Sequence, residues 1–416
     1  MKVLVSAYYC EPGKGSEQGI GWGLVQQIAK SHDVWVLTPG RNRASIAPHI
    51  DTRDGSTARF VYVDVPLWTA PSIRRSDTEI HYYLWQVAAY FAGLRLNRVI
   101  HFDLIHHVTM TRYWSPSFLS MLPTPFVWGP VGGGESAPVA FWSSFGFRGK
   151  LHEATRALAR KISEHDPFLR RTAREASIGL ATSEETASRM RRLGCGQVSV
   201  LSSVGLDRSD LERLFSLPLH SGPPFRLVSI GRLLHWKGFH LSLRAFASFH
   251  RQCPESEYWI FGDGPERTRL EKLARDLEVS DKVTIWGTMV RTEVLKRLSE
   301  CDVLIHPSLH ESGGWVCLEA MAAGRPVVCL NLGGPALQVT RETGIKVRPS
   351  SELKTIDELT RAISRLAKDA PLRLCMGSAS RQRVKEHFDW ANKARILART
   401  YQAALRCKAN DVPSFS

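Results

Sequence analysis

The sequence lacks any long apolar run and any paired cysteine motif. No stretch reaches the roughly 18 apolar residues that a membrane-spanning helix needs. The eight cysteines form no CxxC pair, which excludes a zinc ribbon and a disulfide scaffold and is typical of reduced thiols. The first ten residues have no signal-peptide apolar segment. We therefore expect a cytoplasmic protein.

The usual signatures of nucleotide cofactors and metals are also missing. The glycines after the first apolar run do not match GxGxxG, and no GxxxxGK[ST] loop is present. There is no DxD motif and no histidine–carboxylate cluster with metal-ligand spacing. The sequence thus predicts neither a bound metal ion nor a resident cofactor.

Length and charge limit what remains. The chain has 416 residues, of which 43% are apolar, so we expect two or three domains with large cores. The formal net charge of +15 indicates a polyanionic partner such as an anionic membrane or a phosphorylated substrate. Nucleic acid is not expected, because no binding-module signature occurs and the basic residues are not interleaved with aromatics.

The first 205 residues have the pattern of an α/β domain. Apolar strands alternate with helices, beginning with residues 2–7, 24–30 and 34–38. The first strand leads into a glycine-rich loop, in which Gly15, Ser16 and Glu17 are the candidate ligand contacts. A purely structural tight turn explains this loop equally well. Residues 77–99 predict an aromatic-rich helix whose aromatics form part of a core more often than a membrane face, and residues 145–176 predict a basic helix with a solvated face.

A change in composition over residues 202–224 marks a domain boundary. A second series of strands and helices follows from residue 225. We predict two Rossmann-like, doubly wound parallel-sheet domains that face a cleft, over residues 1–205 and 206–389.

The second domain carries ligand-compatible residues at several strand ends. Its first strand leads into GRLLHWKG, in which Arg232 and Lys237 are placed to hold a diphosphate. Gly231 precedes this arginine. Later strands end in further turns, and their candidate contacts are Gly262, Gly264, Trp286 and Gly287.

Residues 306–328, HPSLHESGGWVCLEAMAAGRPVV, read as a strand end, a glycine loop, a helix and a strand. Glu311 and Glu319 lie eight positions apart, on either side of Gly313 and Gly314. The loop lies at a helix N-terminus, which favours negative charge or hydroxyl oxygens. Taken alone, two glutamates at this spacing indicate solvated surface carboxylates more than an acid/base couple.

Together these motifs resemble the retaining glycosyltransferases of family 4, which have the GT-B fold. The resemblance rests on residues 231–238, 262–265, 286–287, 306–328 and the FDW at 388–390. It extends along essentially the whole chain and is weaker in the first domain. It also implies that a final helix, residues 390–406, packs back on the first domain.

The resemblance implies a role for each candidate residue. Arg232 and Lys237 would bind the donor diphosphate, and Glu319 the ribose. Glu311, with the backbone of Ser312, Gly313 and Gly314, would hold the donor sugar.

In the first domain the sugar-contacting histidine would be His107 or His106, and the loop with Gly15 to Glu17 would approach the phosphate and the acceptor. The loop departs from the usual pattern in having Gly314–Trp315 where an aromatic normally stands between two glycines.

The implied activity is retaining, metal-independent transfer of a sugar from a nucleotide-diphosphate sugar. The acceptor would be a glycan or a lipid-linked molecule, in bacterial surface polysaccharide or glycolipid synthesis. The basic first domain would meet the inner face of an anionic membrane. The alternative is a non-catalytic sugar-nucleotide-binding or scaffold protein on the same frame.

Overall fold

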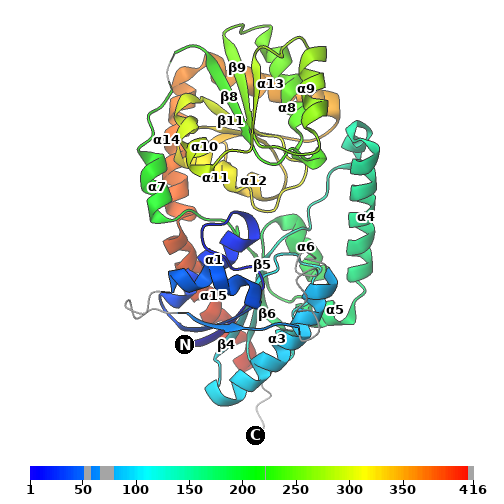
Figure 1. Cartoon of the computed structure of the whole chain (residues 1–416), viewed down its shortest axis with the longest axis vertical. Coiled ribbons are helices and arrows are strands. Elements are labelled where there is room, and N and C mark those ends of the chain that lie inside the picture. Colours follow the sequence, from blue (N-terminus) through cyan, green and yellow to red (C-terminus); the bar gives the residue numbers. More distant parts are fainter. Residues whose placement is uncertain (51–57, 66–78, 221, 411–416) are drawn as a thin grey trace. The chain divides into compact units, whose positions relative to one another are not determined.

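The computed structural model describes residues 1–50, 58–65, 79–220 and 222–410. These form two compact units. Unit 1 comprises Met1–Gly134, Ala157–Gly205 and Trp390–Ser416, and unit 2 comprises Glu135–Arg156 and Leu206–Asp389. Each unit is built on one sheet of parallel strands, so the predicted pair of doubly wound α/β domains is confirmed (Figure 1).

Unit 1 contains a seven-stranded sheet in the order β3-β2-β1-β4-β5-β6-β7. Its inner strands are mostly buried, as expected when helices cover both faces, whereas the edge strands β3 and β7 are only partly buried. They are β1 (Lys2–Ala7), β2 (Asp33–Thr38), β3 (Arg59–Tyr62), β4 (Leu104–Thr109), β5 (Phe126–Val131), β6 (Ala176–Ala181) and β7 (Val198–Val200).

The helices of unit 1 include the last one of the chain. They are α1 (Ser16–Ala29), α2 (Arg43–Ile46), α3 (Glu79–Ile100), α5 (Pro167–Glu175), α6 (Glu184–Arg192) and α15 (Trp390–Asn410), with short turns η1 (Gly40–Asn42), η2 (Ala47–His49) and η3 (Phe118–Met121). Helix α15 packs on α1, where a Cβ added to Gly23 would lie 2.6 Å from the Trp390 ring. Residues 77 and 78 of the predicted aromatic helix lie outside the described residues.

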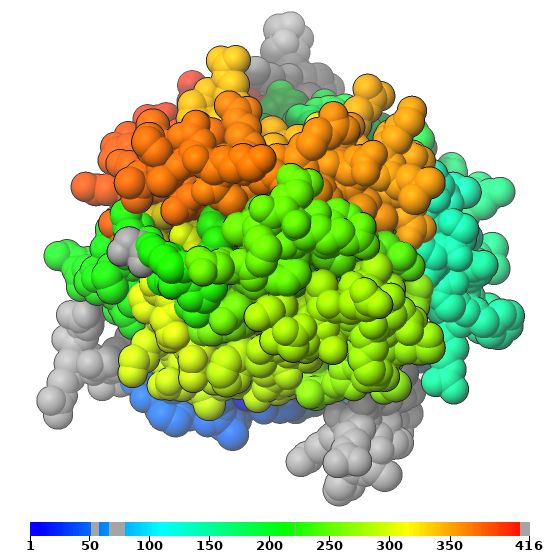
Figure 2. Space-filling model, turned by 90° about the horizontal axis from the view of Figure 1, so that it is seen from above, coloured from blue at the N-terminus to red at the C-terminus, as the bar shows by residue number. Residues whose placement is uncertain are grey.

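Unit 2 contains a six-stranded sheet in the order β10-β9-β8-β11-β12-β13. The strands are β8 (Phe225–Ile230), β9 (Ser256–Phe261), β10 (Val283–Gly287), β11 (Val303–His306), β12 (Val327–Leu330) and β13 (Gly344–Val347). Their helices are α7 (Arg208–Phe215), α8 (Phe239–His250), α9 (Arg267–Asp276), α10 (Arg291–Arg297), α11 (Trp315–Ala322), α12 (Gly333–Gln338), α13 (Glu352–Lys368) and α14 (Ala370–His387), with turns η4 (Val139–Ser144), η5 (His235–Lys237) and η6 (Leu298–Glu300). Figure 2 looks down on this unit, whose green, yellow and orange segments fill most of the view.

In both sheets the strand order reverses at one place. In unit 2 this place lies between β8 and β11, and in unit 1 between β1 and β4. Crossovers on the two sides of such a point run to opposite faces, which leaves a crevice at the carboxyl ends of the two strands. The loops after β8 and β11 hold the strongest sequence candidates of unit 2.

One segment lies elsewhere than predicted. The sequence assigned residues 135–156 to the first domain, but they belong to unit 2. Phe141 and Phe145 are buried in the unit 2 core with Leu233 and Phe239, and this apolar burial holds the segment there. The predicted basic helix is two helices, α4 (Phe147–Ser163) and α5, and Asp166 caps the second one.

Among the described residues, no helix is both long and apolar enough to cross a membrane.

Candidate functional site

The site of unit 2 begins where the loops after β8 and β11 touch. Gly238 adopts φ 69°, and a Cβ there would lie 2.1 Å from the carbonyl oxygen of Pro307, so only glycine allows this approach. Lys237 precedes that glycine, and its Nζ donates a hydrogen bond to Oε2 of Glu311. The structure therefore brings these two predicted residues together as an ion pair.

The electrostatic surroundings keep Glu311 ionised. Burial alone would raise the pKa of Glu311, but the Lys237 ammonium and the backbone N–H of Gly314 outweigh it and lower the pKa to about 2. His306 lies close by, with Nε2 at 3.8 Å from the same carboxylate oxygen. Burial and the lysine charge lower the pKa of His306 to about 4, so the imidazole is neutral at pH 7. The pair thus presents one cation and one anion, and each of the two side chains is 19% exposed.

Helix α11 starts directly beyond this pair. Its N-cap is Gly314 in the left-handed conformation, with φ 69°. The loop before it is fixed by a hydrogen bond from the Gly334 N–H to the Glu311 carbonyl at 2.8 Å and by the Gln338 amide on the Gly313 carbonyl. A helix N-terminus held beside a lysine favours an anionic ligand.

The second glutamate of the motif is engaged elsewhere. Glu319 is buried, and its Oε1 accepts hydrogen bonds from Arg291, whose Nε lies at 2.8 Å and Nη2 at 2.7 Å. Arg291 also contacts Asp210, which in turn binds Arg213 at 2.6 Å. Burial raises the pKa of Glu319 in spite of this arginine. Glu311 and Glu319 therefore belong to two separate charge networks and not to one acid/base couple.

The strand-end glycines serve backbone packing in the first place. A Cβ on Gly262 would lie 1.9 Å from the Gly231 carbonyl oxygen, and one on Gly264 would lie 2.6 Å from the Leu233 carbonyl oxygen. Gly231 and Gly262 have φ values of 152° and 139°, which other residues rarely adopt. The loops after β8, β9 and β10 are thereby drawn together, which leaves main-chain groups close to the crevice.

Arg232 and Trp286 differ in how far they are fixed. The Arg232 side chain is exposed, and it makes no hydrogen bond or ion pair within the described part of the chain. Trp286 stacks on Phe261 at 5.9 Å, and the Arg297 guanidinium lies 4.4 Å above its ring. Trp286 is thus part of the packing of the strand ends, whereas Arg232 is available for a ligand. Gly287, beside this tryptophan, has φ 73°.

In unit 1 the predicted loop forms the start of α1. Gly15 is the N-cap and Ser16, at φ 61°, is the first helical residue; both are exposed. Glu17 accepts a hydrogen bond from the Thr111 hydroxyl, which joins the loop after β1 to the loop after β4. These residues therefore line the strand-order reversal of unit 1.

The two candidate histidines lie on β4 and are fully buried. His106 uses both ring nitrogens inside the unit, since Nδ1 lies 2.7 Å from the Tyr401 hydroxyl and Nε2 contacts the Gly129 carbonyl. His107 places Nε2 at 3.0 Å from the Met110 carbonyl, and its buried Nδ1 has no partner within the described residues. Burial lowers the pKa of each to about 4. Only His107 therefore has a ring nitrogen left for a ligand.

Sequence reasoning missed several residues of the site. Arg291 and Asp210 were not candidates because an arginine at the start of a helix and an aspartate near a linker are ordinary surface residues. His306 and His310 lie within residues 306–328, but they were interpreted only as part of a strand end and a loop. Among the described residues, no group of three or more histidine, cysteine, aspartate or glutamate side chains is arranged to hold a metal ion.

Comparisons with known proteins agree with the fold and the motifs. Residues 214–383 match the family described as glycosyl transferases group 1. A glycogen synthase of Mycobacterium tuberculosis is 28% identical over 258 residues, which are 62% of this chain and 61% of that protein. A lipopolysaccharide core biosynthesis glycosyltransferase of Rhizobium meliloti is 32% identical over 186 residues, 44% of this chain and 50% of that protein.

A solved structure matches nearly the whole chain. Anabaena HepE in complex with UDP is superposed with a TM-score of 0.62 and 20% identity, covering 97% of this chain and 100% of that one. This match confirms the predicted GT-B fold. The aligned regions span about half to three fifths of the length of the two curated relatives. The predicted assignment to group 1 is confirmed for residues 214–383, while the narrower family 4 stays a prediction.

Proposed function

We propose, from the match of residues 214–383 to the glycosyl transferases group 1 family, that the protein transfers a sugar from a nucleotide-diphosphate sugar to a glycan or lipid-linked acceptor. The observation that carries this proposal is the Lys237–Glu311 pair, held by the Gly238 contact at the strand-order reversal of unit 2. Open α/β sheets bind ligands at that place. Of two relatives, one is a glycogen synthase and one acts in lipopolysaccharide core biosynthesis, which supports polysaccharide or glycolipid synthesis.

The donor would lie across the loops described above. Its diphosphate would meet Lys237, the exposed Arg232 and the N-terminus of α11, because these offer positive charge at a water-accessible crevice. Glu311 and the backbone of the adjacent loop would bind sugar hydroxyls, and Glu319 the ribose. UDP is the first nucleotide to test, because the Anabaena structure is a UDP complex.

The transfer step itself needs little from the side chains beyond charge. The bond from the anomeric carbon to the diphosphate oxygen breaks, and the acceptor oxygen bonds to the same carbon. The acceptor proton passes to the leaving diphosphate, whose negative charge is stabilised by Lys237 and Arg232. The acceptor attacks on the face from which the diphosphate leaves, so the anomeric configuration is retained. We propose that no metal ion is required.

The proposal is tested with the purified full-length chain. Calorimetry with UDP, GDP and ADP measures donor binding, and hydrolysis of the matching nucleotide sugars measures turnover, with and without EDTA. We expect micromolar binding of one nucleotide, slow hydrolysis that EDTA leaves unchanged, and a product whose anomeric configuration, read by NMR, equals that of the donor. Binding of none of the nucleotides would refute the proposal. Binding without turnover of any donor would favour the non-catalytic alternative.

Helix α3 supports the further expectation of a membrane-bound acceptor. Ile80, Leu84, Val87 and Phe91 follow one another at helical spacing and are between 37% and 63% exposed. The same face continues into exposed Arg95 and Arg98. An apolar row with basic residues at one end fits the interface of an anionic bilayer, where apolar side chains enter and arginines meet lipid headgroups.

Vesicle sedimentation tests this surface. We expect the protein to bind phosphatidylglycerol vesicles and to lose most of this binding in Phe91→Glu and in Arg95→Glu/Arg98→Glu, with unchanged thermal unfolding. Val290→Glu is the matched control, since Val290 is an exposed apolar residue of unit 2. Equal binding of the wild type and Phe91→Glu would contradict the assignment.

A further inference from the structure

Glu153 is a buried carboxylate on an otherwise exposed helical turn. Its neighbours in α4, from Leu151 to Thr155, are exposed, yet Glu153 itself is only 3% exposed. Gly149, four residues earlier, faces the same way, and a Cβ there would lie 3.0 Å from the His235 ring. A carboxylate is costly to bury unless it is hydrogen-bonded, so its position calls for specific partners.

The partners of Glu153 come from two different loops. Its Oε1 accepts hydrogen bonds from Nε2 of His235, at 3.1 Å, and from Nε2 of His310, at 3.2 Å. Burial would raise the pKa of Glu153, but these two hydrogen bonds hold it well below its usual range. His235 precedes Lys237 by two residues, and His310 directly precedes Glu311. One carboxylate oxygen thus joins the loop of the site lysine to the loop of the site glutamate.

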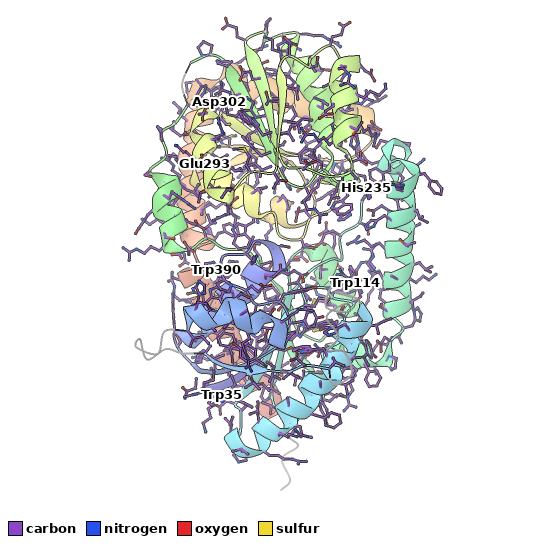
Figure 3. The ribbon with its side chains drawn as sticks, viewed as in Figure 1. Trp35, Trp114, His235, Glu293, Asp302 and Trp390 are labelled. Carbon is purple, nitrogen blue, oxygen red and sulfur yellow. The ribbon has the colours of Figure 1, made fainter. Side chains whose placement is uncertain are left out.

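Aromatic rings connect the same three segments a second time. His152 stacks on Trp236 with centroids 5.0 Å apart and an interplanar angle of 11°. Trp236 stacks in turn on His310 at 5.1 Å and 14°. The backbone adds a hydrogen bond from the Leu309 N–H to the Trp236 carbonyl at 2.8 Å. Figure 3 shows His235 next to α4.

The start of the same segment reaches the glycine loop. Oε2 of Glu135 accepts a hydrogen bond from the Ser312 hydroxyl at 2.7 Å. Residues 135–156 therefore hydrogen-bond to both loops, through Glu153 to His235 and His310 and through Glu135 to Ser312, all within unit 2. None of these contacts involves Lys237 or Glu311 directly.

We propose that residues 135–156 act as a clamp on the donor site, in which Glu153 is a positioning residue that fixes the loops bearing Lys237 and Glu311 in register. The consequence of the clamp is a preformed donor site, and this consequence rests on the proposed function. A pocket whose loops are already ordered binds with a smaller loss of conformational freedom. Loss of the clamp therefore weakens donor binding without removing any group that touches the donor.

Five variants test the clamp. Glu153→Ala removes both hydrogen bonds, whereas Glu153→Gln keeps the shape and the accepting oxygen. Asp302→Ala is the matched control, because Asp302 is also a 3% exposed carboxylate of unit 2 and accepts from His220 at 3.0 Å, far from the two loops in Figure 3. Lys237→Met, alone and with Glu153→Ala, shows whether the effect of Glu153 passes through the lysine.

We expect Glu153→Ala to raise the Kd for UDP about tenfold and to speed hydrogen exchange in residues 232–240 and 308–316. Glu153→Gln should stay within about twofold of the wild type, and in the Lys237→Met background Glu153→Ala should add little. Asp302→Ala should lower the melting temperature and leave UDP affinity unchanged. A general loss of stability would instead lower affinity in both alanine variants.

The outcomes separate the clamp from the proposed function. If the wild type and Glu153→Ala bind UDP equally, the clamp is wrong and the proposed function stands. If the wild type binds none of UDP, GDP and ADP, the proposed function fails. Hydrogen exchange is then the measurement that tests the clamp. Equal protection of the two loops in the wild type and Glu153→Ala would then overturn the clamp.

Discussion

The two strand-order reversals, one in each unit, share a topology but carry different chemistry. In unit 2, the loops after β8 and β11 present Lys237 and Glu311 as an ion pair. In unit 1, the loops after β1 and β4 present the Glu17 carboxylate, hydrogen-bonded to Thr111, together with the partly exposed Tyr9. One place is built around a lysine–glutamate pair, and the other around a carboxylate, a hydroxyl and an aromatic ring.

The difference shows how one frame can serve two kinds of ligand. A lysine beside a helix N-terminus selects for a diphosphate. Aromatic faces and neutral hydroxyls suit a polyhydroxylated molecule, because sugars offer both C–H faces and hydroxyl groups. The fold determines where a ligand lies in each unit, and the residues at the strand ends determine its class.

Replacing the cation of unit 2 should have the largest effect. Lys237→Met leaves Glu311 without its counter-ion and removes the charge proposed to meet the diphosphate. We expect a loss of at least about 100-fold in transfer or donor hydrolysis. Lys272→Met is the control, because Lys272 forms an exposed pair with Asp276 on α9 and should leave activity unchanged. Full activity in Lys237→Met would show that the ion pair is only structural.

Breaking the second charge network should mainly affect stability. Arg291→Ala leaves the buried Glu319 without the arginine that binds it, at a cost of about 3 kcal/mol in the free energy of unfolding at pH 7. The cost should shrink on acidification, since a protonated Glu319 needs no counter-ion. Adding Glu319→Gln to Arg291→Ala should recover much of the loss. Denaturant unfolding checks this, and an additive double mutant would contradict it.

Acidification should weaken both units through buried neutral histidines. The pKa values of His106, His107 and His306 are lowered to about 4, so the unfolded chain binds protons between about pH 6.5 and 4 that the folded chain excludes. Stability therefore falls as the pH falls through this window, by on the order of 2 kcal/mol for each of the three histidines between pH 7 and 4.5.

Glu311 should make the stability depend on pH only in a lower range than the histidines do. Its lowered pKa stabilises the folded state above about pH 4.3, and this contribution is lost as the pH falls towards 2. Urea unfolding at a series of pH values measures both effects. His306→Gln should flatten part of the first decline, and an unchanged slope in that variant would argue against a buried neutral histidine.

The smallest expected effect lies in unit 1. Glu17→Gln keeps the size of the side chain but weakens its hydrogen bond with Thr111, which orders the acceptor-side loops. We expect the KM for the acceptor to rise about tenfold while donor affinity stays the same. Steady-state kinetics with each substrate varied in turn separates the two. A change in donor affinity instead would remove the distinction between the two places.

Most of the fold and half of the unit 2 site could be predicted from the sequence. Alternating apolar strands and helices predicted both sheets, and GRLLHWKG and the Glu311 loop were predicted at one sheet edge because both follow buried strands. The ion pair between Lys237 and Glu311 was not predicted. The glycines were predicted as places of close approach, and they are, although Gly262 and Gly264 approach neighbouring backbone. A glycine in the sequence shows that no side chain is present at that position, but it does not show which group approaches the backbone there.

The remainder depended on contacts between distant segments. Arg291 reaches Glu319 from another loop, and Glu153 reaches His235 and His310 from a helix assigned to the other domain. Nothing local distinguishes Glu153 from the exposed residues around it. The same holds for His106, since Tyr401, its partner 295 residues away, is what occupies its Nδ1.

The segment Glu135–Arg156 has a consequence for recombination. The chain passes from one unit to the other at four points, after residues 134, 156, 205 and 389. A cut at residue 205 alone would separate α15 from α1 and would strip Phe141 and Phe145 from the core they complete. An exchange of unit 2 between relatives, in the laboratory or in evolution, must therefore include the gene segment for residues 135–156, which lies within the coding region of unit 1.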